Sequence, residues 1–208
     1  MKELFVNKSN RLRGYDYNLP GAYFITICLK YRKCLFGDII NGKSVLNKLG
    51  SIAENCWMEI PNHFEDAESG PFVIMPNHIH GIIYILEDCQ NIVNQTYVFD
   101  SLKYSLDLQN DNSQIDLMHS KLSTTIGSYK SSVTKEINRA IKQPRFKWQT
   151  SFHDHIIRNE NEMQNIANYI ELNPANWADD FENEKYRASL SDKERKTLLK
   201  ELYKQFSV

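Results

Sequence analysis

The sequence is poor in the features that mark several specialised protein classes. Its 208 residues contain four cysteines, none of them in a Cys-x-x-Cys pair, which argues against a disulfide scaffold and against a structural zinc site. The longest apolar runs, at residues 24–29 and 81–86, are too short to cross a bilayer, and no secretory signal opens the chain. We therefore expect a reduced, cytoplasmic protein that does not enter a membrane.

An excess of charge of one sign is also missing, because 25 Lys and Arg nearly balance 26 Asp and Glu. The charges are nevertheless unevenly distributed. Residues 1–40 carry seven cationic residues against three acidic ones, residues 121–158 carry eight against two, and residues 87–120 carry one against six. If folding brings the two basic segments together, their surface could follow a phosphate backbone, although ordinary solvated charge is an equally simple account.

Six cations in the basic segments are candidate DNA contacts. They are Arg11, Arg13, Lys130, Lys135, Arg139 and Arg158. The nearby aromatic residues Tyr15 and Tyr17 could stack on the bases of a single strand. For Trp148 and Phe152, packing in the core is the better interpretation. Charge and aromatic content therefore permit a nucleic-acid interface without establishing one.

Hydrophobic residues make up 41% of the chain, which suits one ordinary domain with its own core. β-Branched and aromatic runs predict strands, and a 3.6-residue apolar period predicts helices. We expect strands at residues 23–30, 71–75, 79–86 and 152–158, and a hairpin-like stretch at 35–40 that turns at Asn41-Gly42. We expect helices at residues 44–60, 124–141, 160–172 and 191–206.

The order of these elements indicates an α+β fold in which helices pack on an antiparallel, ferredoxin-like sheet. A parallel sheet is disfavoured because Pro76-Asn77 is too short a connection for a parallel crossover. We assign residues 1–180 to a single domain with a polar insertion at about 87–120, and residues 181–208 to a C-terminal helical tail.

A pair of histidines is the sharpest feature of the sequence. His78 and His80 lie two residues apart within an expected strand, so their side chains share one face while Ile79 points to the other. Two imidazoles on one face suit a metal ion. By itself this pattern is weak, since two surface or hydrogen-bonded histidines would produce it as well.

A tyrosine and an asparagine near the end of the helix expected at 160–172 form the second feature. Tyr169 and Asn173 are four residues apart, so they would lie on one helix face. The phenol and the amide would then offer two oxygens to one point in space. A half-buried tyrosine beside an asparagine that caps the helix is the simpler alternative.

Together the two features describe a reactive site. His78, His80 and Asn173 could supply three neutral ligands to a divalent cation, and Mg²⁺ or Mn²⁺ would suit this set. The cation would polarise a phosphodiester, and Tyr169 would attack its phosphorus, forming a phosphotyrosine and releasing a 3′-hydroxyl. Basic groups would have to favour the phenolate, and Lys130, His155 and Arg158 are candidates, with His155 as a group placed behind the ligands.

The sequence resembles a known family of enzymes. A histidine pair followed by a tyrosine on a later helix resembles the HUH single-strand endonucleases, and within them the REP-associated tyrosine transposases. The resemblance extends over much of the chain. It is carried by residues 11–17, 21–28, 36–37, 73–80, 126–131, 148–149, 152–158 and 169–174.

The resemblance implies an antiparallel sheet of RRM-like topology, with the helices of the HUH endonuclease fold packed on it. It implies that His78 and His80 bind the metal, that Asn173 completes the ligand set, and that Tyr169 is the nucleophile. The substrate would be single-stranded DNA with a nearby hairpin or palindromic repeat. A tyrosine that acts on a second copy would require a homodimer, which the sequence leaves open.

Two other functions compete with a single-tyrosine DNA transposase or nickase. One is a single-stranded nucleic-acid binding protein that keeps the fold without catalysis. The other is a P-loop nucleotide hydrolase, because residues 37–44 match the pattern GxxxxGK[ST]. Bulky Ile39 and Ile40 and the negative charge of Asp38 are unsuited to wrapping a phosphate, so we interpret this segment as a hairpin turn.

Overall fold

The computed structural model describes residues 12, 15–87, 120–142, 146–195 and 197–198. The candidate DNA contacts Arg11 and Arg13 lie outside the described residues, and so does nearly all of the insertion expected at 87–120. Among the residues that are described, no helix combines the length and the apolar character needed to cross a membrane.

A four-stranded antiparallel sheet forms the centre of the molecule. Its strands lie in the order β4 (Ala67–Ile74), β5 (His78–Ile85), β1 (Gly21–Cys28) and β6 (His153–Ile157). Each neighbouring pair runs antiparallel. The predicted α+β class with an antiparallel sheet is therefore confirmed.

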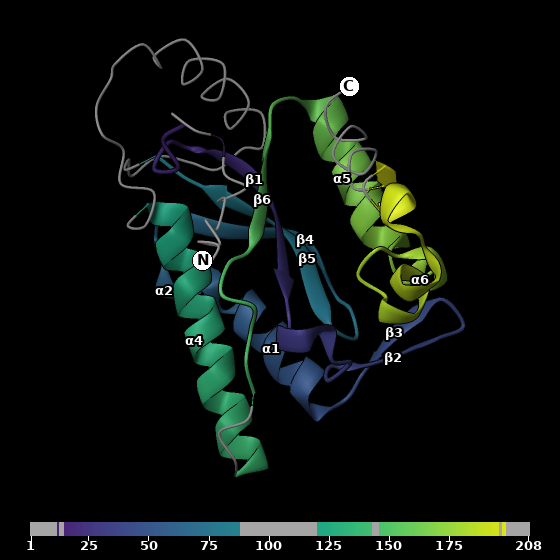
Figure 1. The fold of residues 1–208 in the computed structure, drawn as a ribbon. Helices are drawn as coiled ribbons and strands as arrows, with labels where there is room; N and C mark the ends of the chain where they lie inside the picture. The colour runs from purple at the N-terminus through teal and green to yellow at the C-terminus, as the bar shows by residue number, and fades with distance from the viewer. Residues whose placement is uncertain (1–11, 13–14, 88–119, 143–145, 196, 199–208) are drawn as a thin grey trace, which may run out of the picture.

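Helices cover both faces of this sheet (Figure 1). On one face lie α1 (Lys48–Met58) and α4 (Lys121–Ile141), and on the other lies α5 (Glu160–Leu172). The remaining elements are η1 (Lys30–Arg32), β2 (Gly37–Ile40), β3 (Lys43–Leu46), α2 (Ile60–His63), η2 (Trp177–Asp179) and α6 (Glu184–Ser189).

The alternation of side chains along the strands divides the core in two. Ile25 and Ile79 are fully buried on the α1 and α4 side, where Trp57 packs. Phe24, the neighbour of Ile25, faces the opposite way into a smaller cluster that includes Ile166 of α5. Since successive strand residues face opposite sides, β1 and β5 supply both cores.

The first α-helix begins later than its apolar period predicts. Residues 43–46 form β3, and α1 begins only at Lys48, with Asn47 as its cap. The Asn47 side chain accepts hydrogen bonds from the backbone N–H groups of Leu49 and Gly50. The prediction of a helix start at Ser44 was wrong, because Val45 and Leu46 fit the apolar pattern of a strand as well as that of a helix.

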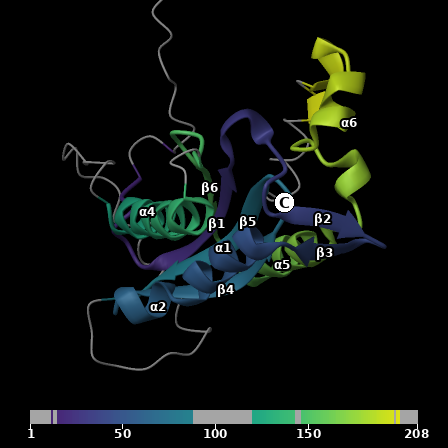
Figure 2. The same cartoon turned by 90° about the horizontal axis from the view of Figure 1, so that it is seen from below.

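The segment that matches a P-loop is a β-hairpin. β2 pairs with β3 in register across the turn at Asn41-Gly42, and both turn residues have positive φ, 52° and 70°, as a two-residue hairpin requires. Figure 2 shows the hairpin extending away from α4. Its turn touches the segment after α5, where a Cβ on Gly42 would lie 3.4 Å from Ala175 Cα. The interpretation of this segment as a hairpin turn is confirmed.

Two of the aromatic residues considered for base stacking are core residues. Tyr15 and Tyr17 are 0% and 1% exposed, and their rings pack edge to face with centroids 5.1 Å apart. The base-stacking interpretation was therefore wrong for this pair. Trp148 and Phe152 are half-buried against the larger core, as the core-packing interpretation predicted.

The chain after α5 is only partly described. Helical residues at 192–195 follow α6. Ser191 and Glu194 form a capping box at their start, since Glu194 N donates to Ser191 Oγ and Ser191 N donates to Glu194 Oε2. The rest of the helix expected at 191–206 lies largely beyond the described part of the chain.

Candidate metal and tyrosine site

The sheet places the two histidines side by side on the face that α5 covers. In the pairing of β5 with β1, His78 lies opposite Cys28 and His80 opposite Thr26. The two imidazole rings have centroids 4.4 Å apart. Ile79 between them is fully buried in the other core. The shared face that the spacing of two residues predicts is thus present.

The hydrogen bonds of His78 fix which of its nitrogens carries the proton. Its Nδ1 lies 2.8 Å from Asn77 Oδ1, and a carbonyl oxygen can only accept, so Nδ1 is the protonated nitrogen. The orientation of the Asn77 amide is itself determined, because its Nδ2 donates to the backbone carbonyls of Arg32 and Glu182. Nε2 of His78 therefore carries a lone pair, and it is buried without a hydrogen-bond partner.

His80 is held between β1 and α5. Its Nδ1 lies 2.9 Å from Thr26 Oγ1, and its ring stacks on Phe24 with centroids 5.3 Å apart. Burial lowers the pKa of His80 well below its usual range, and neighbouring His78 lowers it further. Burial likewise lowers the pKa of His78 to about 3, with a smaller contribution from Arg32. Both imidazoles are therefore neutral at pH 7, the form in which histidine binds metals.

Helix α5 brings Tyr169 to this pair. Its start is fixed by the Asn159 side chain, which accepts from Glu162 N, and by Glu162, whose carboxylate accepts from Arg158 N. Ile166 and Ile170 then anchor the helix on the sheet. Tyr169 lies beside this apolar stripe and is half-buried.

The Tyr169 hydroxyl reaches the Nε2 edge of His80. Its oxygen lies 3.3 Å from His80 Nε2, and the two rings have centroids 5.2 Å apart. Phe24 supports the tyrosine ring from the side, in an edge-to-face contact of 5.9 Å. One ring nitrogen of His80 thus contacts Thr26 of β1, and the other contacts the Tyr169 hydroxyl of α5.

Asn173 lies in the same site, one turn beyond Tyr169, and binds an acidic residue. Its Nδ2 donates to Asp180 Oδ2 over 3.0 Å, while its Oδ1 is buried without a hydrogen-bond partner. Burial raises the pKa of Asp180, although His80 and the bond from Asn173 act against this rise. The helix end thus delivers an unpaired amide oxygen next to a buried carboxylate.

Asp180 is the group that the sequence patterns did not reveal. One nitrogen each of His78 and His80 and one carboxylate oxygen of Asp180 all lie within 4.8 Å of one another. All three residues are buried. Asp180 follows η2, where no strand or helix period predicts which side chains share a face. The only signal in the sequence was an acidic pair that follows shortly after the expected ligand Asn173.

The donor set fits a divalent metal ion. Two neutral imidazoles and one carboxylate are typical metal ligands, and two of the buried atoms left without hydrogen bonds, His78 Nε2 and Asn173 Oδ1, are lone-pair donors of this same site. Because an unpaired buried polar atom is costly, a cation contacted by these atoms would relieve that cost. The His78-His80-Asp180 cluster could therefore bind a metal ion.

A second group of contacts ties the segment after η2 to the end of β1. Glu182 forms an ion pair with Arg32, and its carboxylate accepts from Cys28 Sγ over 3.3 Å. Burial raises the pKa of the Cys28 thiol to about 11, so this cysteine remains a protonated donor at neutral pH. Trp177 completes the enclosure, with its ring centroid 5.9 Å from that of His78.

The remaining candidate residues lie apart from the histidine pair. Lys130, Lys135 and Arg139 are on α4, across the sheet from α5. Arg139 pairs with Glu136 on its own helix over 2.8 Å. The exposed Arg158 precedes the α5 cap, and its guanidinium lies 3.9 Å from Glu162.

His155 of β6 contacts the start of α5. It lies opposite Phe24 in the pairing of β1 with β6, and its Nε2 is 2.6 Å from Glu162 Oε1. The structure thus connects His155 to the helix that carries Tyr169. The placement of His155 behind the metal ligands stays a prediction.

Comparison with known proteins finds a relative in sequence and more distant similarities in structure. An uncharacterized protein of Haemophilus influenzae is 40% identical over 177 residues, which is 83% of this chain and 91% of that protein. No family model matches the sequence.

Two solved structures resemble the chain more distantly. A REP-associated tyrosine transposase bound to a REP hairpin is 19% identical with a TM-score of 0.47, over 81% of this chain and 74% of that one. A putative transposase of Deinococcus radiodurans is 16% identical with a TM-score of 0.40, over 77% of this chain and 95% of that one.

Proposed function

The chain belongs to the same family as the uncharacterized Haemophilus influenzae protein, and we propose that it is a metal-dependent endonuclease and strand transferase for single-stranded DNA, with Tyr169 as nucleophile. The observation that carries this proposal is the 3.3 Å contact between the Tyr169 hydroxyl and His80 Nε2. It brings a nucleophilic oxygen to a cluster of buried metal-ligand atoms, the arrangement that covalent phosphoryl transfer requires.

His78, His80 and Asp180 would hold the metal, with the Asn173 amide oxygen beside them. When bound, a divalent cation would polarise a phosphodiester and favour the phenolate of Tyr169. Oxygen ligands favour Mg²⁺, and two imidazoles shift the preference toward Mn²⁺. We therefore expect the same two metals that the histidine pair and Asn173 suggested.

In the proposed reaction Tyr169 attacks the DNA, and neighbouring residues orient the two histidines. Tyr169 Oη forms a bond to phosphorus as the bond from phosphorus to the 3′ oxygen breaks, and that oxygen takes up a proton to become a free 3′-hydroxyl. The product is a 5′-phosphotyrosine that keeps the energy of the broken bond, so rejoining needs no ATP. Phe24 and Thr26 orient His80, and Asn77 orients His78.

The proposed substrate is single-stranded DNA with a hairpin or palindromic repeat close to the cleaved bond. Arg158 and the α4 cations Lys130, Lys135 and Arg139 are the described candidates for contacts with its phosphates. All four groups of the site, the two imidazoles, the carboxylate and the phenol, come from one copy of the chain. The proposed site therefore needs no group from a second copy, and the homodimer stays a prediction.

The experiment is a covalent-adduct assay. The protein is incubated with Mn²⁺ and single-stranded hairpin oligonucleotides that cover the DNA on both sides of its gene. A protein–DNA adduct that survives denaturing electrophoresis, and that is lost in Tyr169→Phe and in EDTA, is the expected result. If oligonucleotides bind in the native gel but give no adduct, the proposed enzyme activity is wrong. The protein would then be a nucleic-acid binding protein that keeps the fold without catalysis.

A further inference from the structure

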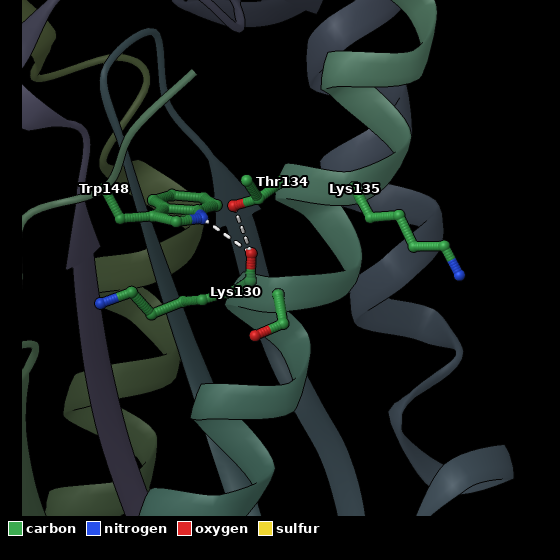
Figure 3. A pocket seen from close by; sticks show the side chains of 5 residues that line it. Lys130, Thr134, Lys135 and Trp148 are labelled. Carbon is green, nitrogen blue, oxygen red and sulfur yellow. Dashed lines mark hydrogen bonds between the residues drawn. The ribbon is translucent and has the colours of Figure 1, made fainter. Parts of the chain in front are cut away.

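A pocket lies on the opposite face of the sheet from Tyr169. It is formed by the middle of α4 and the segment that precedes β6, and its lining residues are Lys130, Ser131, Thr134, Lys135 and Trp148 (Figure 3). The lining combines two ammonium groups, two hydroxyl groups and one indole, and it includes no acidic residue. This is the chemistry that binds a phosphate next to an aromatic base.

The pocket is held in shape by hydrogen bonds to one carbonyl. Lys130 O accepts from Trp148 Nε1 over 3.0 Å and from Thr134 Oγ1 over 2.7 Å, as Figure 3 shows. The indole is therefore fixed against α4. Part of its surface stays open, because Trp148 is only half-buried.

The two ammonium groups retain donors for a ligand. Lys130 Nζ donates to the carbonyls of Gln149 and Thr150 over 2.8 Å and 3.1 Å, which uses two of its three N–H bonds. Lys135 is exposed, and in Figure 3 its side chain extends away from Trp148. A phosphate beside the indole would thus contact Lys130 directly, and Lys135 would reach it by turning its flexible side chain back toward the pocket.

A short segment connects this pocket with the tyrosine site. Trp148 bridges to Leu29, and Gln149 N donates to Cys28 O. Five residues after Trp148, His153 lies opposite Thr26, which in turn lies opposite His80. Leu29 and Thr26, the partners of Trp148 and His153, are three residues apart. Three strand steps span about 10 Å, the length of about three stacked nucleotides at 3.4 Å each.

We propose that this pocket binds a nucleotide of the same DNA strand that reaches Tyr169, with its phosphate on Lys130 and Lys135 and its base against Trp148. The proposal rests on the proposed function for the identity of the ligand. It assigns the single-stranded flank a second anchoring point about three nucleotides from the cleaved bond, across the β6 edge of the sheet.

The test measures how oligonucleotide length and pocket residues depend on each other. Fluorescently labelled hairpin oligonucleotides are shortened one nucleotide at a time from either single-stranded end, and their dissociation constants are measured by anisotropy. For the unsubstituted protein we expect a drop in affinity of about tenfold at one length, where the anchored nucleotide is removed. Lys135→Gln and Ser131→Asp, both at exposed positions, are expected to bind the full-length oligonucleotide about tenfold more weakly and to lack that drop.

Lys48→Gln is the matched control, since it removes an equally exposed lysine from α1. It should keep both the affinity and the drop. For Lys135→Gln the slope of log affinity against log salt should also fall by about 0.7, one phosphate contact. Pocket variants that bind every length like the unsubstituted protein, or that weaken every length equally, would overturn the proposal.

The two proposals fail in different ways. Absence of a Tyr169-dependent adduct refutes the nuclease and leaves the binding measurement intact, because anisotropy does not require cleavage. A Tyr169-dependent adduct together with no dependence of affinity on the pocket refutes the anchoring point alone.

Discussion

At the scale of single residues, the site depends on an asparagine that does not touch the proposed metal. Asn77 accepts from His78 Nδ1, and its own amide is fixed by two backbone carbonyls. This chain of hydrogen bonds decides that the lone pair of His78 lies on Nε2. Since groups behind metal ligands hold the tautomer and orientation of the imidazole, Asn77 would support the proposed metal binding, although the turn Pro76-Asn77 suggested only a tight connection.

Replacement of Asn77 tests this dependence. We expect Asn77→Ala to weaken Mn²⁺ binding about tenfold to a hundredfold, because His78 loses the acceptor that fixes its tautomer. Isothermal titration calorimetry measures the affinity. Asn62→Ala, which removes an exposed side chain that donates only to Glu59, is the control and should bind Mn²⁺ like the unsubstituted protein. Equal affinities for all three proteins would contradict the role of Asn77.

The identity of the third ligand can be decided between two neighbouring residues. Asp180→Asn keeps the shape of the side chain and removes its charge, so we expect Mn²⁺ affinity to fall by at least about tenfold. Asn173→Ala removes an uncharged oxygen and should cost less. Calorimetry on both variants ranks them, and a larger loss for Asn173→Ala would return the ligand role to the residue that the sequence indicated.

At the scale of elements, local patterns predicted the parts of the site that lie within regular structure. The period of two along β5 placed both histidines on one face, and the apolar period over residues 160–172 gave α5 its observed bounds. Asp180 was not predicted, because it lies in irregular chain after η2, where no periodic pattern indicates which side chains meet. The start of α1 was misplaced because no local signal separates an apolar strand residue from an apolar helix residue.

Strand β5 also carries a glycine that its neighbours require. A Cβ on Gly81 would lie 2.4 Å from Trp57 Cζ2 and 2.9 Å from Phe72 Cβ. We expect Gly81→Ala to lower the free energy of unfolding by about 1–3 kcal/mol, since the core must shift to admit the methyl group. Urea denaturation followed by circular dichroism measures this change.

Gly127 in α4 provides the opposite case for the same substitution. A Cβ there meets nothing within 4 Å, and the residue is exposed. Gly127→Ala should therefore raise the free energy of unfolding, by up to about 1 kcal/mol, because alanine favours the helix. If both substitutions change the free energy of unfolding in the same direction, the close packing of Trp57 on Gly81 does not explain the effect of Gly81→Ala.

At the scale of the whole molecule, the larger core contains several tyrosines whose hydroxyl groups are shielded from water. Burial raises the pKa of Tyr15, Tyr23 and Tyr129 above the usual value of 10. Tyr129, for example, donates to Ala53 O over 3.0 Å and so joins α4 to α1. The two helices that cover one face of the sheet are thus connected by a group that must stay protonated.

These tyrosines make the fold sensitive to alkali. Their pKa values are higher in the folded than in the unfolded chain, so their contribution to stability is complete below pH 10 and is lost as the pH rises above it. Each tyrosine should lower the free energy of unfolding by about 1.4 kcal/mol per pH unit in that range. Urea denaturation at pH 8, 10 and 11 measures the slope. Tyr129→Phe should be less stable at pH 8 by about 1 kcal/mol. Above pH 10 its free energy of unfolding should fall less steeply with pH, and an unchanged slope would contradict the raised pKa of Tyr129.

The position of Asp180 and Glu182 late in the chain has a consequence for biosynthesis. On a translating ribosome the histidine pair is made about a hundred residues before Asp180, and before the partner of Arg32 exists. A nascent polypeptide therefore carries the strand of the pair, and even α5 with Tyr169, before the carboxylate that completes the cluster. Metal binding by this cluster, and the DNA cleavage proposed to depend on it, would therefore require synthesis of the chain through Asp180.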